Sequence, residues 1–348
     1  MKKMWQWALM LVLATVLAAC GGGGDKPKEE TGKENSKGES EGYEEARIRL
    51  AYNLPQDHHI SIGVENFAKE VNERSGGKVN IQVYPAGQLL SDKDMNQSIL
   101  SGGVEMGMNS STLWASTVPA MGIFDVPYVF NNYATVGELL QGEFGDILRE
   151  EMEAKGAYPL IFADYGYMQF ANNKHPLTSP EDFKGLKIRS IGDLPSELIQ
   201  AYGASPVFMG GGEVYMALQR KTVDGATSGT TAMLQRKYEE VTDYLTINNY
   251  AYLEFLLAVN GEFWNGLPEK TRQLLTEVAA ETETWIREQA EKEDAESAKQ
   301  LEEKGMEVYV VPEDELQQWI DASAPVRDVF VQTAGEVGQK LLDLSDQQ

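Results

Sequence analysis

The chain has 348 residues, of which 42% are hydrophobic and 24% charged, so a fibrous protein and a mostly disordered one are both excluded. Its 54 acidic residues outnumber the 30 basic ones and give a formal net charge of −24, which argues against binding nucleic acid or an anionic membrane through a basic face. The single cysteine excludes a disulfide scaffold and a cysteine-based zinc site within one chain.

The N-terminus has the pattern of an export signal. Lys2 and Lys3 precede a short apolar stretch, and residues 1–19 are predicted to be a signal peptide. The sequence LAAC that ends at Cys20 resembles a bacterial lipobox, in which the cysteine is lipidated. The alternative is an ordinary signal peptide with an incidental cysteine. Residues 20–45 contain no aliphatic side chain and are predicted to be a flexible tether, so we expect an extracytoplasmic protein held at the membrane by a lipid anchor only.

From residue 46 the hydrophobic pattern switches repeatedly between the periods of strands and helices. Strands are predicted at 47–52, 78–84 and 104–109, with amphipathic helices between them. This order predicts a largely parallel sheet covered by helices. A second series follows. Its members are helices near 134–141, 144–155, 194–202 and 213–220, a capped turn at 179–185, and strands at 157–164, 167–172, 186–190 and 222–227.

Two later segments complete the predicted α/β fold. Residues 252–259 form a continuous apolar run, which is typical of a strand buried on both faces. The longest helical pattern covers about 268–304, and we interpret it as a helix that spans two lobes. A surface or coiled-coil helix is the alternative, because the apolar stripe thins after Ile286. The chain is predicted to cross between two α/β lobes more than once.

The sequence offers little for catalysis. His58 and His59 are adjacent, so in regular structure their side chains diverge, and His175 lies far along the chain. Neither an HExxH nor a GxSxG motif is present. We therefore predict no catalytic residue, no metal ligand and no cofactor. A surface hydrolase is an alternative that would need a paired nucleophile and base at strand ends.

Binding residues are sought after strands, because ligands of open α/β sheets lie at the carboxyl ends of strands. Arg189 closes the predicted strand LKIR, and a guanidinium pairs with a carboxylate through two parallel hydrogen bonds. A surface position at a strand end is the alternative for this arginine. Tyr165 is a second candidate because it follows a predicted strand.

Several stretches, read in order, resemble one known family. They are NLPQDHH (53–59), FAKEVNERSGGKVNIQVYPAGQL (67–89), FDVPYVF (124–130), SPEDFKGLKIR (179–189) and YGASPVFMGGGEVYMALQRKTVDG (202–225). They resemble the solute-binding proteins of TRAP transporters, also called the dicarboxylate-binding protein family. The resemblance covers about residues 46–304, nearly all of the chain after the tether.

This resemblance implies a periplasmic-binding-protein-like fold of two α/β lobes joined by hinge strands and crossed by a long helix. We place lobe I at 46–166 with about 253–290, and lobe II at 167–252 with about 291–348. The resemblance also implies a monomer that closes over one small organic acid anion and delivers it to TRAP membrane permease subunits. A sensor that presents its ligand to a membrane receptor is the alternative.

The resemblance also implies site residues. By position, Arg189 pairs with the ligand carboxylate, and Asn53 and Asp92 match positions that reach the ligand in some members. Four departures from the sialic-acid binders mark further expected contacts. Met168 replaces a second arginine, Asn109-Ser110 replaces a glutamate, Gly211 lies where an aromatic side chain precedes the EVY block, and Ser228 lies where a glutamate-asparagine-proline sequence is replaced. These changes imply a ligand other than sialic acid with one main carboxylate, although the glycines are also compatible with a purely structural loop.

Overall fold

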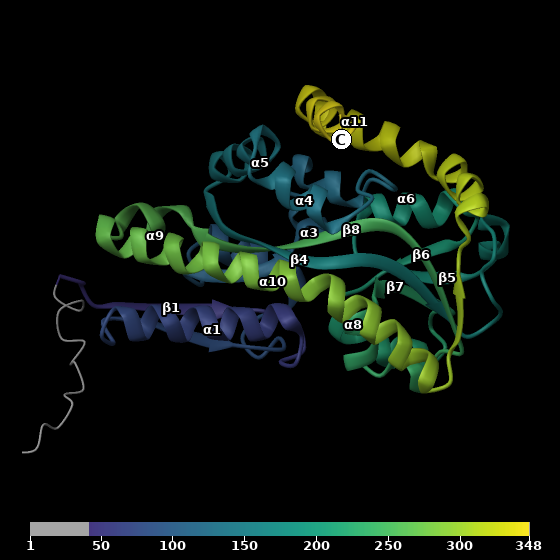
Figure 1. Ribbon diagram of the computed structural model, residues 1–348, viewed down its shortest axis with the longest axis horizontal. Helices are drawn as coiled ribbons and strands as arrows, with labels where there is room; N and C mark the ends of the chain where they lie inside the picture. The colour runs from purple at the N-terminus through teal and green to yellow at the C-terminus, as the bar shows by residue number, and fades with distance from the viewer. Residues whose placement is uncertain (1–41, 348) are drawn as a thin grey trace, which may run out of the picture. The chain divides into compact units, whose positions relative to one another are not determined.

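The computed structural model describes residues 42–347, which form a nine-stranded sheet with helices packed against it (Figure 1). The predicted signal peptide, Cys20 and the tether up to residue 41 lie outside the described residues. The strands are β1 (Ala46–Ala51), β2 (Val79–Tyr84), β3 (Met106–Ser110), β4 (Ala157–Asn172), β5 (Lys187–Ser190), β6 (Ser205–Phe208), β7 (Gly225–Gly229), β8 (Tyr244–Asn260) and β9 (Glu307–Val310). The helices are α1 (His59–Arg74), α2 (Asp92–Leu100), α3 (Ser111–Trp114), α4 (Tyr133–Leu140), α5 (Glu143–Ala154), α6 (Asp193–Ala201), α7 (Val214–Gln219), α8 (Thr230–Gln235), α9 (Gly261–Gly266), α10 (Glu269–Glu303) and α11 (Leu316–Ser345). Five 3-10 turns among the described residues are η1 (Pro119–Asp125), η2 (Pro180–Phe183), η3 (Gly211–Glu213), η4 (Tyr238–Glu240) and η5 (Glu313–Glu315).

The two ends of the sheet are parallel. β1 pairs with β2 and β3, and β5 pairs with β6 and β7. We call β1–β3 with α1–α3 the β1 half, and β5–β7 with α6–α8 the β5 half. The first three strands confirm the predicted β-α-β-α-β order. The sheet as a whole is mixed rather than largely parallel, because β4 and β8 pair antiparallel with each other and with β7 and β3.

The middle strands β4 and β8 connect the two halves. The end of β8 pairs with β3 of the β1 half, and the end of β4 pairs with β7 of the β5 half. The prediction of separate strands at 157–164 and 167–172 is wrong, because β4 continues through a bulge between Asp164 and Gly166. Gly166 has a φ of 103°, which interrupts the side-chain alternation without ending the pairing. The run 252–259 is buried as predicted, within a longer strand.

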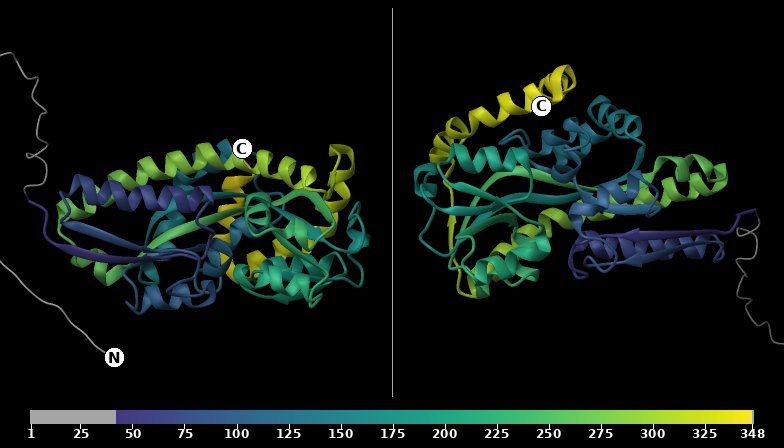
Figure 2. Two further views of the ribbon diagram at one scale, coloured as in Figure 1. Left: turned by 90° about the horizontal axis from the view of Figure 1, so that it is seen from below. Right: turned by 180° about the vertical axis from the view of Figure 1, so that it is seen from behind.

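The long helix α10 packs on both halves. It contacts α1 of the β1 half, α8 of the β5 half and β4 between them (Figures 1 and 2). The alternative of a surface or coiled-coil helix is therefore wrong. Trp285 of the apolar stripe is only partly buried. The buried apolar positions of this stripe are Leu274, Leu275, Val278, Ile286 and Leu301.

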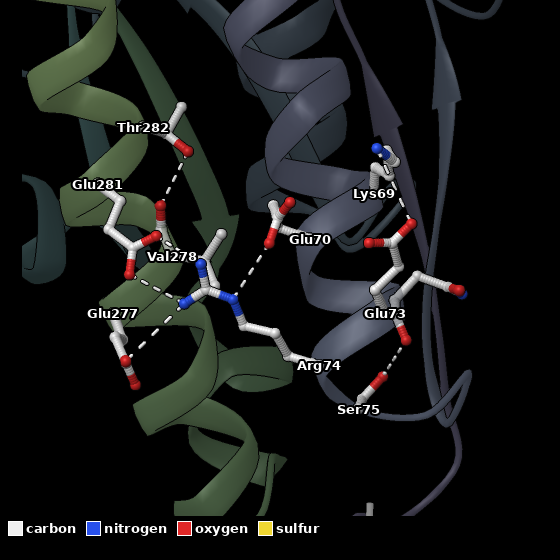
Figure 3. A network of polar contacts seen from close by, with 10 residues as sticks. Lys69, Glu70, Glu73, Arg74, Ser75, Glu277, Val278, Glu281 and Thr282 are labelled. Carbon is white, nitrogen blue, oxygen red and sulfur yellow. Dashed lines mark hydrogen bonds and ion pairs between the residues drawn. The ribbon is translucent and has the colours of Figure 1, made fainter. Parts of the chain in front are cut away.

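Charged side chains connect the end of α1 to α10. Arg74, the last residue of α1, donates from Nη1 to Glu281 of α10 at 2.9 Å, and its Nε bonds Glu70 at 3.3 Å (Figure 3). Glu277 lies 3.8 Å from the same Nη1. These groups are partly exposed to water, so each pair contributes at most about 1 kcal/mol. The apolar stripe of α10 therefore contributes more to this packing than its ion pairs do.

The C-terminal helix α11 has no counterpart in the sequence-based prediction. It contacts η1 and α5 as well as α6 and η2. Its pattern is interrupted by Pro325 and by Gly335, which has the non-helical angles φ 62° and ψ −143°. Both residues break helical periodicity in a sequence, and here the chain continues the helix on either side of a kink.

Candidate functional site

A cavity lies between the two halves, where the carboxyl ends of β1, β3, β5 and β7 meet. It is small, with about 30 Å³ open to the centre of a water-sized sphere. All nine site residues expected from the sequence line it. They are Asn53, Asp92, Asn109, Ser110, Tyr165, Met168, Arg189, Gly211 and Ser228. The structure thus brings these residues together, and their roles as ligand contacts remain predictions.

Arg189 is the cation at the centre of this cavity. Its side chain is only 2% exposed, so the alternative of a surface strand end is wrong. Nε donates to the Met209 carbonyl at 3.0 Å and Nη1 to the Thr227 carbonyl at 2.8 Å. Nη2 is buried and has no partner among the described residues. Burial lowers the pKa of the guanidinium, which still stays charged at neutral pH because its ordinary pKa is so high.

A second guanidinium lines the same cavity and was missed from the sequence. Arg236 follows α8, and its Nη2 lies 3.4 Å from the Asn53 carbonyl across the cavity. It is close enough to Arg189 for the two positive charges to contribute to lowering the pKa of Arg189, although burial is the larger cause. The search of strand ends passed over it because a six-residue helix separates Arg236 from the end of β7.

Asp92 joins the two halves rather than standing free. At the start of α2, its Oδ2 accepts a hydrogen bond from the Gly211 amide of the β5 half at 2.9 Å. Its carbonyl accepts from Asn109 Nδ2 at 2.9 Å, and the same amide group donates to Asn96 at 2.7 Å. Asn109, a residue predicted from the sequence, and Asn96 therefore hold the start of α2 and with it the carboxylate that reaches the other half.

Tyr165 and Ser228 form another contact at the cavity wall. The two hydroxyl oxygens are 3.0 Å apart, and the Gly229 amide donates to the tyrosine oxygen at 3.3 Å. The ring of Tyr165 stacks between His58 and Phe255, with centroids 5.3 and 5.2 Å away. This packing at the β4 bulge fixes the direction of the hydroxyl toward β7.

The glycine loop after β6 is a point of close approach between the halves. A Cβ atom on Gly210 would collide with the Asp92 carboxylate, and one on Gly211 would collide with the Arg236 guanidinium. Gly212 is different, since its Cβ would lie 3.8 Å from Asn53 Oδ1, an ordinary contact. The lack of a side chain at Gly210 lets the loop approach Asp92 of the β1 half, and the lack of one at Gly211 leaves room for Arg236 within the β5 half.

In sequence and in structure, the chain is similar to known proteins. Residues 50–333 match the family model described as bacterial extracellular solute-binding protein, family 7. The chain belongs to this family. Among its relatives, the C4-dicarboxylate-binding periplasmic protein DctP of Rhodobacter capsulatus is 32% identical over 292 residues, which cover 83% of this chain and 87% of the relative. The family and the two-lobe α/β fold expected from the sequence are thereby confirmed.

Solved structures of similar binding proteins have the same fold. A TRAP periplasmic solute-binding protein from Sulfurospirillum deleyianum with bound succinate is 28% identical, with a TM-score of 0.82 over 87% of this chain and 99% of that chain. The sugar acid binding protein DctPAm from Advenella mimigardefordensis, in complex with galactonate, is 26% identical, with a TM-score of 0.84 over 88% and 99% of the two chains. These relatives bind solutes, and this family 7 protein is a binding protein and not an enzyme.

Two histidines of this solute-binding protein, His58 and His59, make hydrogen bonds within the fold. His58 caps α1 by accepting from the Ile60 amide, and His59 Nε2 lies 2.8 Å from the Asp164 carbonyl. Burial lowers the pKa of both rings, so both are neutral at pH 7. His175 is placed outside the cavity. Within residues 42–347, no group of histidine, cysteine and acidic side chains is arranged to hold a metal ion, and no helix combines the length and apolarity needed to cross a bilayer.

Proposed function

We propose that this protein captures a small organic acid anion outside the cytoplasm and delivers it to the membrane permease subunits of a TRAP-type transporter. One observation carries the proposal, namely the buried Arg189 Nη2 that has no partner among the described residues and belongs to a side chain lining the interhalf cavity. A buried donor without a partner costs free energy, and a carboxylate oxygen would remove that cost. Hydrogen bonds between charged partners contribute about 1.5–3 kcal/mol each.

The size of the cavity supports a carboxylate at this position. A volume near 30 Å³ has room for a group of a few atoms rather than for a whole organic acid. Two guanidinium groups, those of Arg189 and Arg236, line that small space. Both would lie within reach of a single carboxylate and would supply the positive charge that a buried anion needs. The relatives with bound succinate and galactonate carry ligands of this chemical class.

Closure of the two halves is the second part of the proposal. The halves are joined by Asp92 with Gly211, and by an ion pair between Lys93 and Glu213 at 2.8 Å. A ligand that binds Arg189 on one half and the wall of the other half stabilises the closed form by its differential affinity for that form. The strands β4 and β8, which run through both halves, are the proposed hinge. In this proposal, lobe I corresponds to the β1 half and lobe II to the β5 half.

Attachment to the membrane is proposed from Cys20 and the polar tether. A lipid on Cys20 would hold the binding protein at the membrane, and the tether would let it reach the permease. Replacing this residue, Cys20→Ser, is expected to move the protein from the membrane fraction to the soluble extracytoplasmic fraction after cell fractionation. A variant that stays in the membrane fraction would contradict lipidation at this cysteine.

The binding proposal is tested with the variant Arg189→Lys. Lysine keeps the positive charge but has no planar guanidinium. It therefore cannot bond two carbonyls and at the same time present a third nitrogen to the ligand. We expect calorimetry with a panel of mono- and dicarboxylates, sugar acids and their uncharged amides to show binding of acids only, weakened about 100-fold by the variant.

A matched control is available on another strand. Arg49 of β1 forms a fork with Glu105 through Nε and Nη2 at 2.9 and 2.7 Å, and it does not line the cavity. Arg49→Lys should therefore leave the affinity unchanged. Equal affinity for acids and their amides, or equal loss in both lysine variants, would remove Arg189 from the proposed role.

A further inference from the structure

A larger chamber lies beside the carboxylate cavity. About 440 Å³ of it is open to the centre of a water-sized sphere, compared with about 30 Å³ in the cavity that contains Arg189. The two spaces share the wall residues Asp92, Leu113 and Ile191. The chamber also touches both halves, through α2, α3 and η1 on one side and the start of α6 on the other, and α11 contributes Phe330. A ligand whose carboxylate fills the smaller space has this chamber as adjoining room for its remaining atoms.

The chamber contains a buried acid that is only half satisfied. Asp125 of η1 is 3% exposed, and its Oδ1 accepts from the Thr112 hydroxyl at 2.7 Å. Its Oδ2 is buried without a partner among the described residues. Burial raises the pKa of this carboxyl to about 7. A hydrogen-bond donor next to Oδ2 would offset part of the cost of burying this group.

The balance of charge differs between the two spaces. Arg189 and Arg236 line the small cavity together with Asp92, whereas the chamber is lined by three acidic residues, Asp92, Asp125 and Asp193. Lys93 also lines the chamber, but its Nζ is paired with Glu213. Above pH 7, where Asp125 is ionised, a second carboxylate at the far end of a ligand would therefore meet like charge, and a hydroxyl or ammonium group would meet an acceptor.

We propose that the chamber holds the part of the ligand beyond its carboxylate, and that Asp125 accepts a hydrogen bond there from a donor on the ligand. The ligand class is then a carboxylic acid with a hydroxyl or ammonium group at its far end, in preference to a linear dicarboxylate. This inference rests on the proposed function, because it needs a carboxylate at Arg189 to set the direction of the ligand.

The test uses straight-chain acids of equal length that differ only in the terminal group. For chains of four to six carbons, calorimetry compares acids that end in a methyl, a hydroxyl, an ammonium or a second carboxylate group. The hydroxyl or ammonium acid is expected to bind at least about tenfold tighter than the methyl and dicarboxylate forms of its best length. Which of the two donors binds tighter identifies the ligand chemistry further.

Two variants connect that preference to Asp125. Asp125→Leu should abolish the preference for a terminal donor, while Glu197→Gln, which removes an exposed charge from α6 outside the chamber lining, should preserve it. If the leucine variant fails to fold, Asp125→Asn is expected to weaken binding of the ammonium acid about tenfold, because an amide carries no charge.

The outcomes separate this inference from the proposed function. Acids that bind wild type with no preference for a terminal donor, or with a preference for a second carboxylate, would overturn the inference and leave carboxylate capture in place. A preference that persists in both Asp125 variants would also overturn it. A wild-type protein that binds none of these acids would contradict carboxylate capture, and with it the assignment of the chamber.

Discussion

Arg189 is held by the fold at two nitrogens, and its third is buried without a partner among the described residues. The carbonyls of Met209, just after β6, and of Thr227 in β7 lie on the two sides of β5 and fix the plane of the guanidinium. A rigid donor loses little conformational freedom when a ligand binds, which favours affinity. The same bonds mean that replacing Arg189 with a small residue would disturb packing as well as binding, so a lysine is the cleaner probe.

The sequence was sufficient to find the residues at strand ends and insufficient to find those after helices. Arg189 and Tyr165 could be predicted because the carboxyl ends of the strands converge at one edge, whereas Asn109 and Ser228 came from the resemblance to the TRAP family. Arg236 and Asp125 could not, since each reaches the site from a short helical turn whose direction depends on tertiary contacts. The inference of one main carboxylate relied on the loss of an arginine at Met168, and Arg236 places a second guanidinium at the cavity from another position.

The role of Arg236 is testable by removing its charge. Arg236→Gln is expected to weaken binding of an acid by about tenfold, because one of two cations near the carboxylate is lost while Arg189 remains. Calorimetry with the best acid of the panel measures the effect. Arg220→Gln, which removes an exposed charge at the end of α7, controls for net charge. Similar affinity in both variants would place Arg236 outside the binding machinery.

At the scale of elements, the loop after β6 and the middle strands decide how the halves meet. The break at Gly166 led the sequence to predict two strands, because a bulge and the end of a strand have the same local signature. Antiparallel pairing with β8 on both sides of the bulge, which is a long-range contact, shows that the strand continues. Likewise α11, interrupted by Pro325 and Gly335, could not be predicted from periodicity, although it forms part of the chamber wall.

The glycine loop yields a prediction with an internal control. In Gly211→Ala the new methyl group would collide with the Arg236 guanidinium of the same half and displace it from its place in the cavity wall. We expect acid affinity to fall at least about tenfold, with little change in the melting temperature of the ligand-free protein. Gly212→Ala adds the same methyl group in an ordinary contact and should bind normally. Equal affinities would show that close approach at this loop is not needed for binding.

Asp294 of α10, which lies against the proposed hinge strand β4, makes the free energy of unfolding depend on pH. Its carboxylate accepts from the Tyr133 hydroxyl at 2.7 Å, the Tyr167 amide at 3.0 Å and the Thr230 hydroxyl at 3.1 Å. These partners lie on α4, on β4 just after the bulge and on α8, so one side chain connects α10 to the middle strand and to the β5 half. Burial raises its pKa to about 6 despite these bonds.

The sign of the effect follows from that raised value. The folded state binds the Asp294 proton more tightly than the unfolded state, so this stabilisation is complete below the unfolded pKa and is lost as pH rises through about 6. Between roughly pH 4 and pH 7, the unfolding free energy of wild type relative to Asp294→Asn should fall by about 2 kcal/mol. Urea denaturation at several pH values measures it, with the exposed Glu288→Gln on the same helix as control. A constant difference would show that Asp294 stays ionised in the fold.

For the whole molecule, the described residues adopt an arrangement in which the halves already touch. Besides Asp92 and Lys93, Gln235 of the β5 half donates to the Asp57 carbonyl of the β1 half at 2.9 Å. Several contacts of this kind are individually weak and partly exposed, so a ligand can shift the balance between open and closed forms. In solution, small-angle X-ray scattering should show a smaller radius of gyration when an acid that binds the protein is added to wild type. No decrease should occur in Arg189→Lys at the same acid concentration, and an identical response would contradict closure driven by this arginine.

The central claim is that Arg189 receives the carboxylate of a captured acid, and a structure of the protein with its tightest acid from the panel tests it most directly. The account predicts a carboxylate oxygen within hydrogen-bonding distance of Arg189 Nη2, with the rest of the ligand directed toward the chamber that contains Asp125. An acid bound with its carboxylate away from Arg189, and with Nη2 still without a partner, would contradict it.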